Sequence, residues 1–348
     1  MSSTRRRIKS HSEVVEIKMS NFLSIKKADV TSRNNLTLLV APNRAGKTHL
    51  LMLIYCIFWS LWRSAKEGNA DKEMVDILKS KIKRTFLLKS LDELVSWEGK
   101  SYEIEVKIDK KINLLISGPP FKAKLSKTGE KELDVSPIYV QPAGMGIYYK
   151  GIYSMKKYYP NWRLITEAIT DFLNDLFIVS EKYKITAEDS KKLLDLFEKL
   201  FEVKFYVQQD RIYAKEKKNY IIEKAASGLQ TLSWFYLAIK YGLLGEILLI
   251  DEPETNLHPE YIDKLSTFLV ELSKKRKVFV ATHSDYLLES LNKQILKKNL
   301  KIDVWVGKLE EKGAVYTAYQ ADKENLIDTS PLSCVYIDIL REGFGYEA

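Results

Sequence analysis

The chain has 348 residues, of which 45% are hydrophobic, so it is large enough to bury a core without disulfide bonds or structural metals. Its two cysteines, Cys56 and Cys334, lie far apart in the sequence, which excludes a disulfide framework and indicates a reducing compartment. The net charge of +9 is compatible with an anionic partner, but a solvated lysine-rich surface has the same composition.

The first residues form the densest basic cluster of the chain: Arg5, Arg6, Arg7 and Lys9. We interpret residues 1–11 as a disordered tail or as an arm that binds nucleic acid. No apolar segment typical of a signal peptide follows, so the cytoplasm is the expected compartment. The longest apolar run, residues 50–62, is shorter than the roughly 18 residues of a membrane span, and no membrane contact is expected.

Residues 14–41 contain short β-branched runs separated by polar turns, which predicts a strand meander that leads into a buried strand. The stretch 48–65 is apolar on nearly every face and predicts a buried helix. A charged helix at about 74–88 and strand-like runs at 101–108 and 113–117 indicate an insertion or β-subdomain. Two amphipathic stretches between residues 160 and 200 indicate a small helical lobe.

A predicted hairpin at 204–215 is followed by alternating elements: a helix at 229–244, a strand at 246–250, a helix at 259–274 and a strand at 277–282. Such alternation predicts a parallel sheet with helices on its faces. We therefore expect a core formed by residues 1–60 and 220–348, with residues 61–219 inserted as a β-subdomain and helical lobe.

Ala41 to Thr48 read A-P-N-R-A-G-K-T, which fits the phosphate-binding pattern G-x-x-x-x-G-K-[ST] except that Ala41 replaces the first glycine. An alanine can serve there if its φ is negative. Lys47 is expected to reach the β and γ oxygens of a nucleotide, and Thr48 to bind Mg²⁺. The residues expected to surround the phosphates are Asn43, Arg44, Ala45, Gly46, Lys47, Thr48 and His49.

The run E-I-L-L-I-D-E predicts a buried strand that ends in two carboxylates. Asp251 is placed to hold Mg²⁺ opposite the Thr48 hydroxyl, and Glu252 is the candidate general base for an attacking water. A solvated acidic pair is the alternative for an isolated D-E, but the apolar strand before it and the phosphate loop favour the metal site.

Two further motifs are weaker by themselves. His283 follows the predicted strand 277–282, where it could be a structural histidine or a sensor of the γ-phosphate at the carboxyl edge of the sheet. Ser227 and Gly228 precede a predicted helix, where they could be an ordinary cap or an anion-binding site.

Taken in order, APNRAGKT, ASGLQ, LLIDEPETNLHP and ATHS resemble the Walker A, signature, Walker B with D-loop, and switch-histidine motifs of ABC-type ATPases. The sequence is most similar to the SMC/RecF-like predicted ATPases with an AAA domain, including the ATPase half of the overcoming-lysogenization-defect proteins. The resemblance covers about residues 12–60 and 220–290. It implies an α/β P-loop NTPase fold: an ABC/SMC-like ATPase head with a mixed sheet, an N-terminal antiparallel β-subdomain and a helical lobe.

The resemblance also implies ATP and Mg²⁺ as cofactors and a homodimer with composite ATP sites. In that family Ser227 and Gly228 would act on the nucleotide of the other protomer, with Asn256 crossing the interface. Gln141 would be a glutamine that senses Mg²⁺ or water, and a turn residue before Pro142 is the alternative. Glu252, His283 and Lys47 would be the catalytic residues.

Two departures from the family limit what the resemblance carries. Leu23 stands where an arginine is frequent, and no acidic nuclease constellation follows the core.

The first functional hypothesis is an ATP-driven switch in DNA maintenance, repair or defence. The second is an ATPase subunit that controls a separate nuclease or toxin without contacting DNA, and the third is a nucleotide-binding scaffold without turnover, against which the intact Glu252 argues.

Overall fold

The computed structural model describes residues 13–128, 136–141, 165–182, 188–208, 211–330 and 332. Its main strands are β1 (Val15–Phe22), β2 (Ile25–Ser32), β3 (Leu36–Val40), β4 (Tyr102–Ile108), β5 (Ile112–Gly118), β6 (Lys122–Lys127), β7 (Ile138–Val140), β11 (Ile247–Asp251), β12 (Lys277–Thr282), β13 (Ile302–Glu310) and β14 (Gly313–Ala321). They form one sheet in the order β6-β5-β4-β1-β2-β14-β13-β3-β12-β11-β7. A smaller sheet joins β8 (Lys204–Gln208), β9 (Arg211–Lys215) and β10 (Asn219–Ile221).

The main sheet has a parallel half and an antiparallel half. Neighbouring strands from β13 through β3, β12 and β11 to β7 are all parallel. Those from β6 through β5, β4 and β1 to β2 are all antiparallel. The strand β14 joins the halves, because it is antiparallel to β13 and parallel to β2. The carboxyl ends of β3, β12, β11 and β7 therefore lie along one edge.

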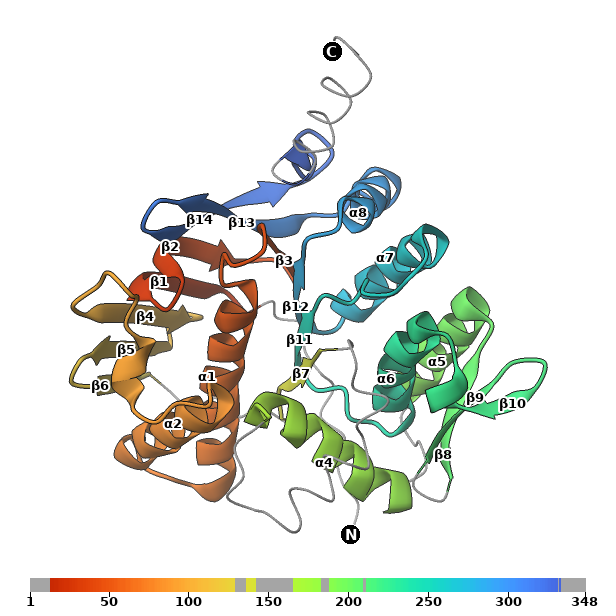
Figure 1. Cartoon of the computed structure of the whole chain (residues 1–348), viewed down its shortest axis with the longest axis horizontal. Helices are drawn as coiled ribbons and strands as arrows, with labels where there is room; N and C mark the ends of the chain where they lie inside the picture. The colour runs from red at the N-terminus through yellow and green to blue at the C-terminus, as the bar shows by residue number, and fades with distance from the viewer. Residues whose placement is uncertain are drawn as a thin grey trace.

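Helices cover both faces of the parallel half, as Figure 1 shows for α1 on one face and α7 and α8 on the other. Leu36, Leu38 and Val40 of β3 enter one hydrophobic core, and Leu39 enters the other. Such strands are apolar throughout because both faces are buried. The helices are α1 (Lys47–Glu67), α2 (Asp71–Thr85), α4 (Glu167–Lys182), α5 (Glu188–Phe201), α6 (Ser227–Lys240), α7 (Pro259–Ser273) and α8 (Asp285–Lys298), with the short helices η1 (Leu91–Leu94) and η2 (Ile222–Lys224).

The predicted α/β class and mixed sheet are confirmed. β1 and β2 form a hairpin that leads in sequence to the buried strand β3, but in the sheet β14 and β13 lie between β2 and β3. The turn that connects β2 to β3 is bound by the side chain of Asp303 in β13. The carboxylate of Asp303 accepts hydrogen bonds from the backbone N–H groups of Arg33 and Asn34 at 2.6 and 2.5 Å.

The division into a core and an insertion at residues 61–219 stays a prediction. Within that segment, β4 pairs with β1 and β7 pairs with β11, so both strands belong to the main sheet. The helical lobe corresponds to α4 and α5, which pack with α6. The basic cluster at Arg5 to Lys9 lies outside the described residues.

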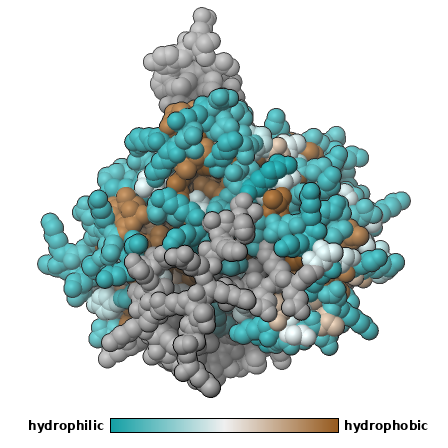
Figure 2. Space-filling view, turned by 180° about the vertical axis from the view of Figure 1, so that it is seen from behind, coloured by the Kyte–Doolittle hydropathy of each residue, from teal (hydrophilic) through white to brown (hydrophobic). Residues whose placement is uncertain are grey.

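The described surface is mostly polar. Figure 2 shows the back of the molecule, where hydrophilic residues cover most of the described surface and apolar residues form separate small patches. Across the described ranges, no helix combines the length and the apolar character that crossing a bilayer requires. The long apolar run in α1 is instead used for packing, and Leu50, Leu53, Ile54 and Ile57 are all buried.

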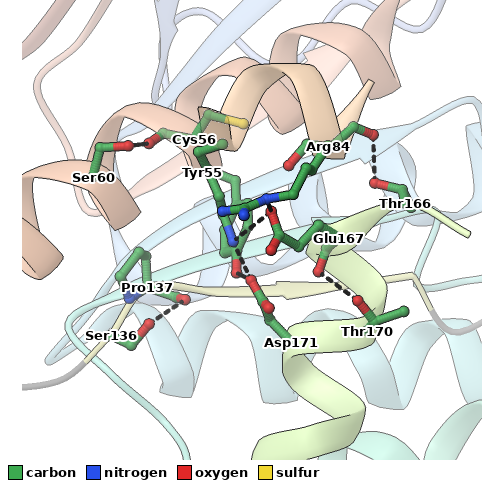
Figure 3. A network of polar contacts seen from close by, with 12 residues as sticks. Tyr55, Cys56, Ser60, Arg84, Ser136, Pro137, Thr166, Glu167, Thr170 and Asp171 are labelled. Carbon is green, nitrogen blue, oxygen red and sulfur yellow. Dashed lines mark hydrogen bonds and ion pairs between the residues drawn. The ribbon is translucent and has the colours of Figure 1, made fainter. Parts of the chain in front are cut away.

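A buried lysine joins three helices on the α1 side of the sheet. Lys81 of α2 is completely buried, forms an ion pair with Asp171 of α4 and lies 3.6 Å from a carboxylate oxygen of Glu167. Its ammonium also lies 3.7 Å from the centroid of the Trp59 ring. Figure 3 shows Glu167 and Asp171 projecting from α4 toward Tyr55, whose hydroxyl donates to Asp171 at 2.7 Å. The lysine therefore ties α4 to α1 and α2.

We predict that Lys81→Met lowers the free energy of unfolding by about 3 kcal/mol, because the two carboxylates lose their buried cation. The matched control is Lys79→Met on the same helix, where the exposed pair with Asp76 contributes about 1 kcal/mol or less. Urea unfolding followed by circular dichroism measures both. An equal decrease in the free energy of unfolding in the two variants would show that the buried ion pair stabilises the fold no more than the exposed one.

Candidate functional site

Four neighbouring parallel strands end at one edge of the sheet, and the sequence-predicted residues follow them. The phosphate loop follows β3, His283 follows β12, Asp251 ends β11, and Gln141 follows β7. Because side chains alternate along a strand, Asp251 lies on the same face as Ile247 and Leu249, which pack in the core that contains α1. Asp251 is thereby directed toward the first turn of α1.

The phosphate loop depends on two residues in the left-handed region. Gly46 caps α1 with φ 86°, and Arg44 has φ 71°. A Cβ atom on Gly46 would lie 2.5 Å from Ser24 Oγ in the β1–β2 turn, so this close approach requires glycine. Ala41 is not among the residues with positive φ, which satisfies the condition for alanine at this place.

Lys47 lies over its own loop. Its ammonium is buried and donates to the carbonyl oxygens of Ala41 at 2.7 Å and Pro42 at 3.2 Å. Burial lowers the pKa of Lys47, and the negative charges of Glu252 and Asp251 partly offset that effect. A phosphate would supply the anionic partner that the lysine lacks in this arrangement.

Asp251 is the best-defined acid of the site. Its Oδ2 accepts hydrogen bonds from Thr48 Oγ1 at 2.8 Å and from the Tyr139 hydroxyl at 2.9 Å. Only 2% of its surface is exposed, and burial raises its pKa, which the two hydrogen bonds partly counter. The other oxygen, Oδ1, is buried without a hydrogen-bond partner.

These groups fit Mg²⁺. The ion prefers hard oxygen ligands and is held in nucleotide sites by one or two protein oxygens together with phosphates and water. Thr48 Oγ1 and the orphaned Asp251 Oδ1 are such oxygens, and a cation would replace the partner that Oδ1 lacks. No group of three or more acidic, histidine or cysteine side chains within the described ranges could hold a metal by itself, so phosphate oxygens would have to complete the shell.

Glu252 and His283 face each other across the ends of β11 and β12. His283 Nδ1 lies 2.9 Å from Glu252 Oε1, and both side chains are partly exposed. Glu252 has φ 51°, and its N–H donates to the carbonyl of Ala281 at 2.9 Å. The left-handed backbone turns the carboxylate away from the strand and toward the cleft, and it costs energy that the neighbouring structure must offset.

A cleft between Glu252 and the phosphate loop has a volume of about 400 Å³, within the range of ligand pockets, and His283 is not among the residues that line it. It is lined by Ser24, Asn43, Arg44, Gly46, Lys47, Thr48, His49 and Glu252. Ala45 is buried behind it, where its carbonyl accepts from the Tyr316 hydroxyl at 3.0 Å. Burial lowers the pKa of His49, whose ring packs beside Phe86.

Ser227, Gly228 and Asn256 lie elsewhere. They line a second cavity of about 570 Å³ that shares no residue with the first. Ser227 is the first residue of α6 and is exposed, and the helix cap is Ala226 without a side-chain hydrogen bond. A Cβ on Gly228 would lie 2.9 Å from the carbonyl oxygen of Asn256, so glycine permits this contact. Ser227 therefore does not serve as an ordinary cap.

Three residues of the site were missed by sequence reasoning. Tyr139 orients Asp251, Ser24 lies against Gly46, and Glu254 accepts a 2.5 Å hydrogen bond from Thr282 Oγ1. Burial raises the pKa of Glu254. Tyr139 stands two positions before Gln141, so the alternation along β7 could have placed both on one face. The D-E-P-E run could likewise have drawn attention to Glu254.

Residues 161–289 match the family described as "AAA domain, putative AbiEii toxin, Type IV TA system". No curated protein matches the sequence. Among solved structures, the chain is similar to an SMC head bound to the C-winged helix domain of ScpA, with TM-score 0.53 and 15% identity over 89% of this chain and 98% of that one.

Two further SMC heads give a TM-score of 0.49. One is the head domain from Thermotoga maritima, with 11% identity over 88% of this chain and 98% of that chain. The other is a head with an extended coiled coil bound to the C-terminal domain of ScpA from Pyrococcus furiosus, with 13% identity over 95% and 99%.

In its fold, the chain is similar to the SMC head. The match to the SMC head confirms the predicted architecture, and together with the AAA-domain match it indicates an ATPase. At 15% identity the similarity shows the fold alone, so the roles of individual residues rest on the geometry above. The likeness to overcoming-lysogenization-defect proteins stays a prediction.

We predict that Gly46→Ala weakens ATP binding, because the new methyl group would lie 2.5 Å from Ser24 Oγ and 3.0 Å from Ile25 Cγ1, and these side chains support the phosphate loop. Gly68→Ala at the other end of α1 is the matched control, since its φ is 67° but nothing lies within 4 Å. Both substitutions should cost roughly 1 kcal/mol of stability through the left-handed backbone. Isothermal titration calorimetry measures the affinity of both variants for ATP. Comparable affinities would show that the contact between Gly46 and Ser24 does not support nucleotide binding.

Proposed function

We propose that the chain binds ATP in the phosphate-loop cleft, hydrolyses it to ADP and phosphate, and forms a dimer around the nucleotide. The observation that carries the proposal is the group at the strand edge, where Thr48 Oγ1 bonds Asp251, Glu252 lines the same cleft as Thr48, and His283 contacts Glu252. Mg²⁺ bound by Thr48 and Asp251 would supply positive charge that neutralises the β and γ oxygens.

Other groups of the protein would bind the phosphates and accept the proton. Lys47 would leave the carbonyl oxygens of Ala41 and Pro42 and bind the β and γ oxygens, while the N–H groups at the start of α1 bind the phosphates. Glu252 would accept a proton from the attacking water as the bond from water oxygen to the γ-phosphorus forms. The bond from the γ-phosphorus to the bridging oxygen breaks, and ADP leaves with the electron pair.

His283 has a separate part in this proposal. Its contact with Glu252 through Nδ1 orients the carboxylate before nucleotide enters, and the exposed imidazole can then bind a γ-phosphate oxygen. Thr282 beside it is held by Glu254, which fixes the end of β12. The histidine would thereby link the presence of the γ-phosphate to the position of the general base.

Dimerisation is proposed because each chain contains two half-sites that do not meet. Lys47 and Glu252 line one cavity, and Ser227 and Asn256 line the other. The exposed start of α6 presents unpaired N–H groups that suit an anion. Two copies related by a two-fold axis could place the α6 start of each on the γ-phosphate of its partner, giving two equivalent composite sites.

We predict that Glu252→Gln stops turnover and traps the ATP-bound dimer, which size-exclusion chromatography with light scattering would detect. Adding Ser227→Arg to Glu252→Gln should leave ATP binding intact and return the protein to a monomer, since the arginine blocks the exposed end of α6 without disturbing a core. A dimer that persists in the double variant would refute the proposed interface.

Mixing two inactive variants tests whether the sites are composite. Lys47→Ala removes nucleotide binding from one protomer, and Ser227→Arg removes the signature from the other. An equal mixture should recover turnover that neither variant shows alone, because only the mixed dimer joins an intact Lys47 of one protomer to an intact Ser227 of the other. Each variant alone should stay inactive, and an inactive mixture would show that the residues do not act across an interface.

The output of the cycle is proposed to be work on nucleic acid, in DNA maintenance, repair or defence. The net charge of +9 supports an anionic partner. The alternative is control of a separate nuclease or toxin, which is compatible with the toxin named in the matching family and with the ScpA fragments named with the SMC heads. Steady-state turnover with and without DNA at low salt decides between them, since only the first requires a response to DNA.

A further inference from the structure

The small sheet β8–β9–β10 has one buried face and one exposed face. Phe205, Ile212 and Ala214 are buried. The alternate residues lie on the other face, where Lys204 pairs with Lys215, Tyr206 with Tyr213, and Gln208 with Arg211. In Figure 1 the sheet stands at one end of the molecule, beyond α5 and α6, with the β9–β10 turn projecting outward.

The centre of this outer face is aromatic. The Tyr206 and Tyr213 rings are stacked, with centroids 5.3 Å apart and an angle of 11° between their planes. Both are partly exposed. Lys240, at the end of α6, donates to the Phe205 carbonyl at 2.9 Å, and its ammonium lies 6.0 Å from the Tyr206 centroid. The stacked pair therefore has part of its surface open to solvent.

Cations surround the tyrosines. Arg211, Lys215, Lys217 and Lys218 are exposed on β9 and its turn, and none of them forms an ion pair in the described part of the chain. Lys204 is a different case, because it binds Glu198 at 2.6 Å. Glu216, the acid beside these cations, accepts a hydrogen bond from the Tyr220 hydroxyl. The exposed face thus combines a partly exposed aromatic pair with four exposed cations, which outnumber the single carboxylate of Glu216 among them.

We propose that this outer face binds single-stranded nucleic acid, with bases stacked on Tyr206 and Tyr213 and phosphates held by Arg211, Lys215, Lys217 and Lys218. An exposed sheet with aromatic residues at its centre and cations at its rim is suited to unpaired bases, whose flat faces a duplex hides. A duplex would reach the cations only, so it would bind more weakly. An acidic protein segment would likewise leave the tyrosines unused.

The β9–β10 turn and the residues after it also reach the start of α6, where Ser227 and Gly228 lie. Glu216, Tyr220 and Lys224 line the cavity that Ser227 and Gly228 also line. The short helix η2 connects β10 to the start of α6. A strand bound on the outer face would restrict the hairpin and bias the position of Ser227. This coupling rests on the proposed function, whereas binding to the face does not.

The test is to measure, by fluorescence anisotropy, the affinity for a labelled oligothymidylate of about 15 nucleotides and for a DNA duplex of the same length. Tyr206→Ala/Tyr213→Ala should weaken binding of the single strand about fivefold or more for each lost base contact, and Tyr206→Phe/Tyr213→Phe should retain it. Lys217→Gln/Lys218→Gln should reduce the salt slope by about 0.7 for each lost phosphate contact.

The matched control is Lys122→Gln/Lys124→Gln, which removes the same charge from exposed positions of β6. An equal loss in this control, or a duplex bound as tightly as the single strand, would overturn the proposal. So would unchanged binding by the tyrosine-to-alanine variant, or a poly-glutamate peptide that binds the wild type while the oligonucleotide does not.

Binding of a fluorescent ATP analogue to the same variants keeps the two proposals apart. Normal ATP binding and dimerisation without single-strand binding would overturn only the inference about this face. A wild type that binds the oligonucleotide at the tyrosines but neither binds ATP nor dimerises would overturn the proposed function and leave the nucleic-acid surface standing.

Discussion

The carboxylate of Asp251 is the contact on which the site depends. It ends β11, receives a hydrogen bond from Thr48 at the start of α1 and another from Tyr139 of β7. One side chain thereby sets the position of a helix and two strands relative to each other. Taking it out of water raises its pKa, so the charged form needs both hydroxyl donors and a cation. The same feature that makes the residue costly to bury makes it suited to bind metal.

The surroundings of Asp251 continue into the helical lobe. The Tyr139 and Tyr55 rings lie 6.0 Å apart, Tyr55 bonds Asp171 of α4, and Asp171 is paired with the buried Lys81. These contacts form a contiguous packed route from the carboxylate of Asp251 to α4. Because packed cores rearrange between discrete states and do not deform continuously, a change at the phosphate loop has a physical path toward the lobe that precedes α6.

The other side of the molecule is organised around α6. Its start is exposed beside Asn256, and the hairpin before it carries a stacked tyrosine pair among exposed cations. Thr231 of α6 donates to the Thr255 carbonyl at 3.0 Å, so this region is also connected to the loop that follows β11 and contains Glu252. The two cavities are thus separate surfaces of one connected body, a requirement for a switch that closes on a second copy.

The sequence by itself determined the phosphate loop, the acidic strand end, the histidine after β12 and the alternation of strands and helices. These features are local, because each is defined by residues that are close together in the sequence. They are apolar periodicity, glycine at a left-handed position, and carboxylates next to a buried run. Only the tertiary structure decided that β13 and β14 separate β2 from β3, that Ser24 supports Gly46, and that Tyr139 orients Asp251. Those contacts join residues far apart in the chain, and no local pattern encodes which distant strand will lie beside another.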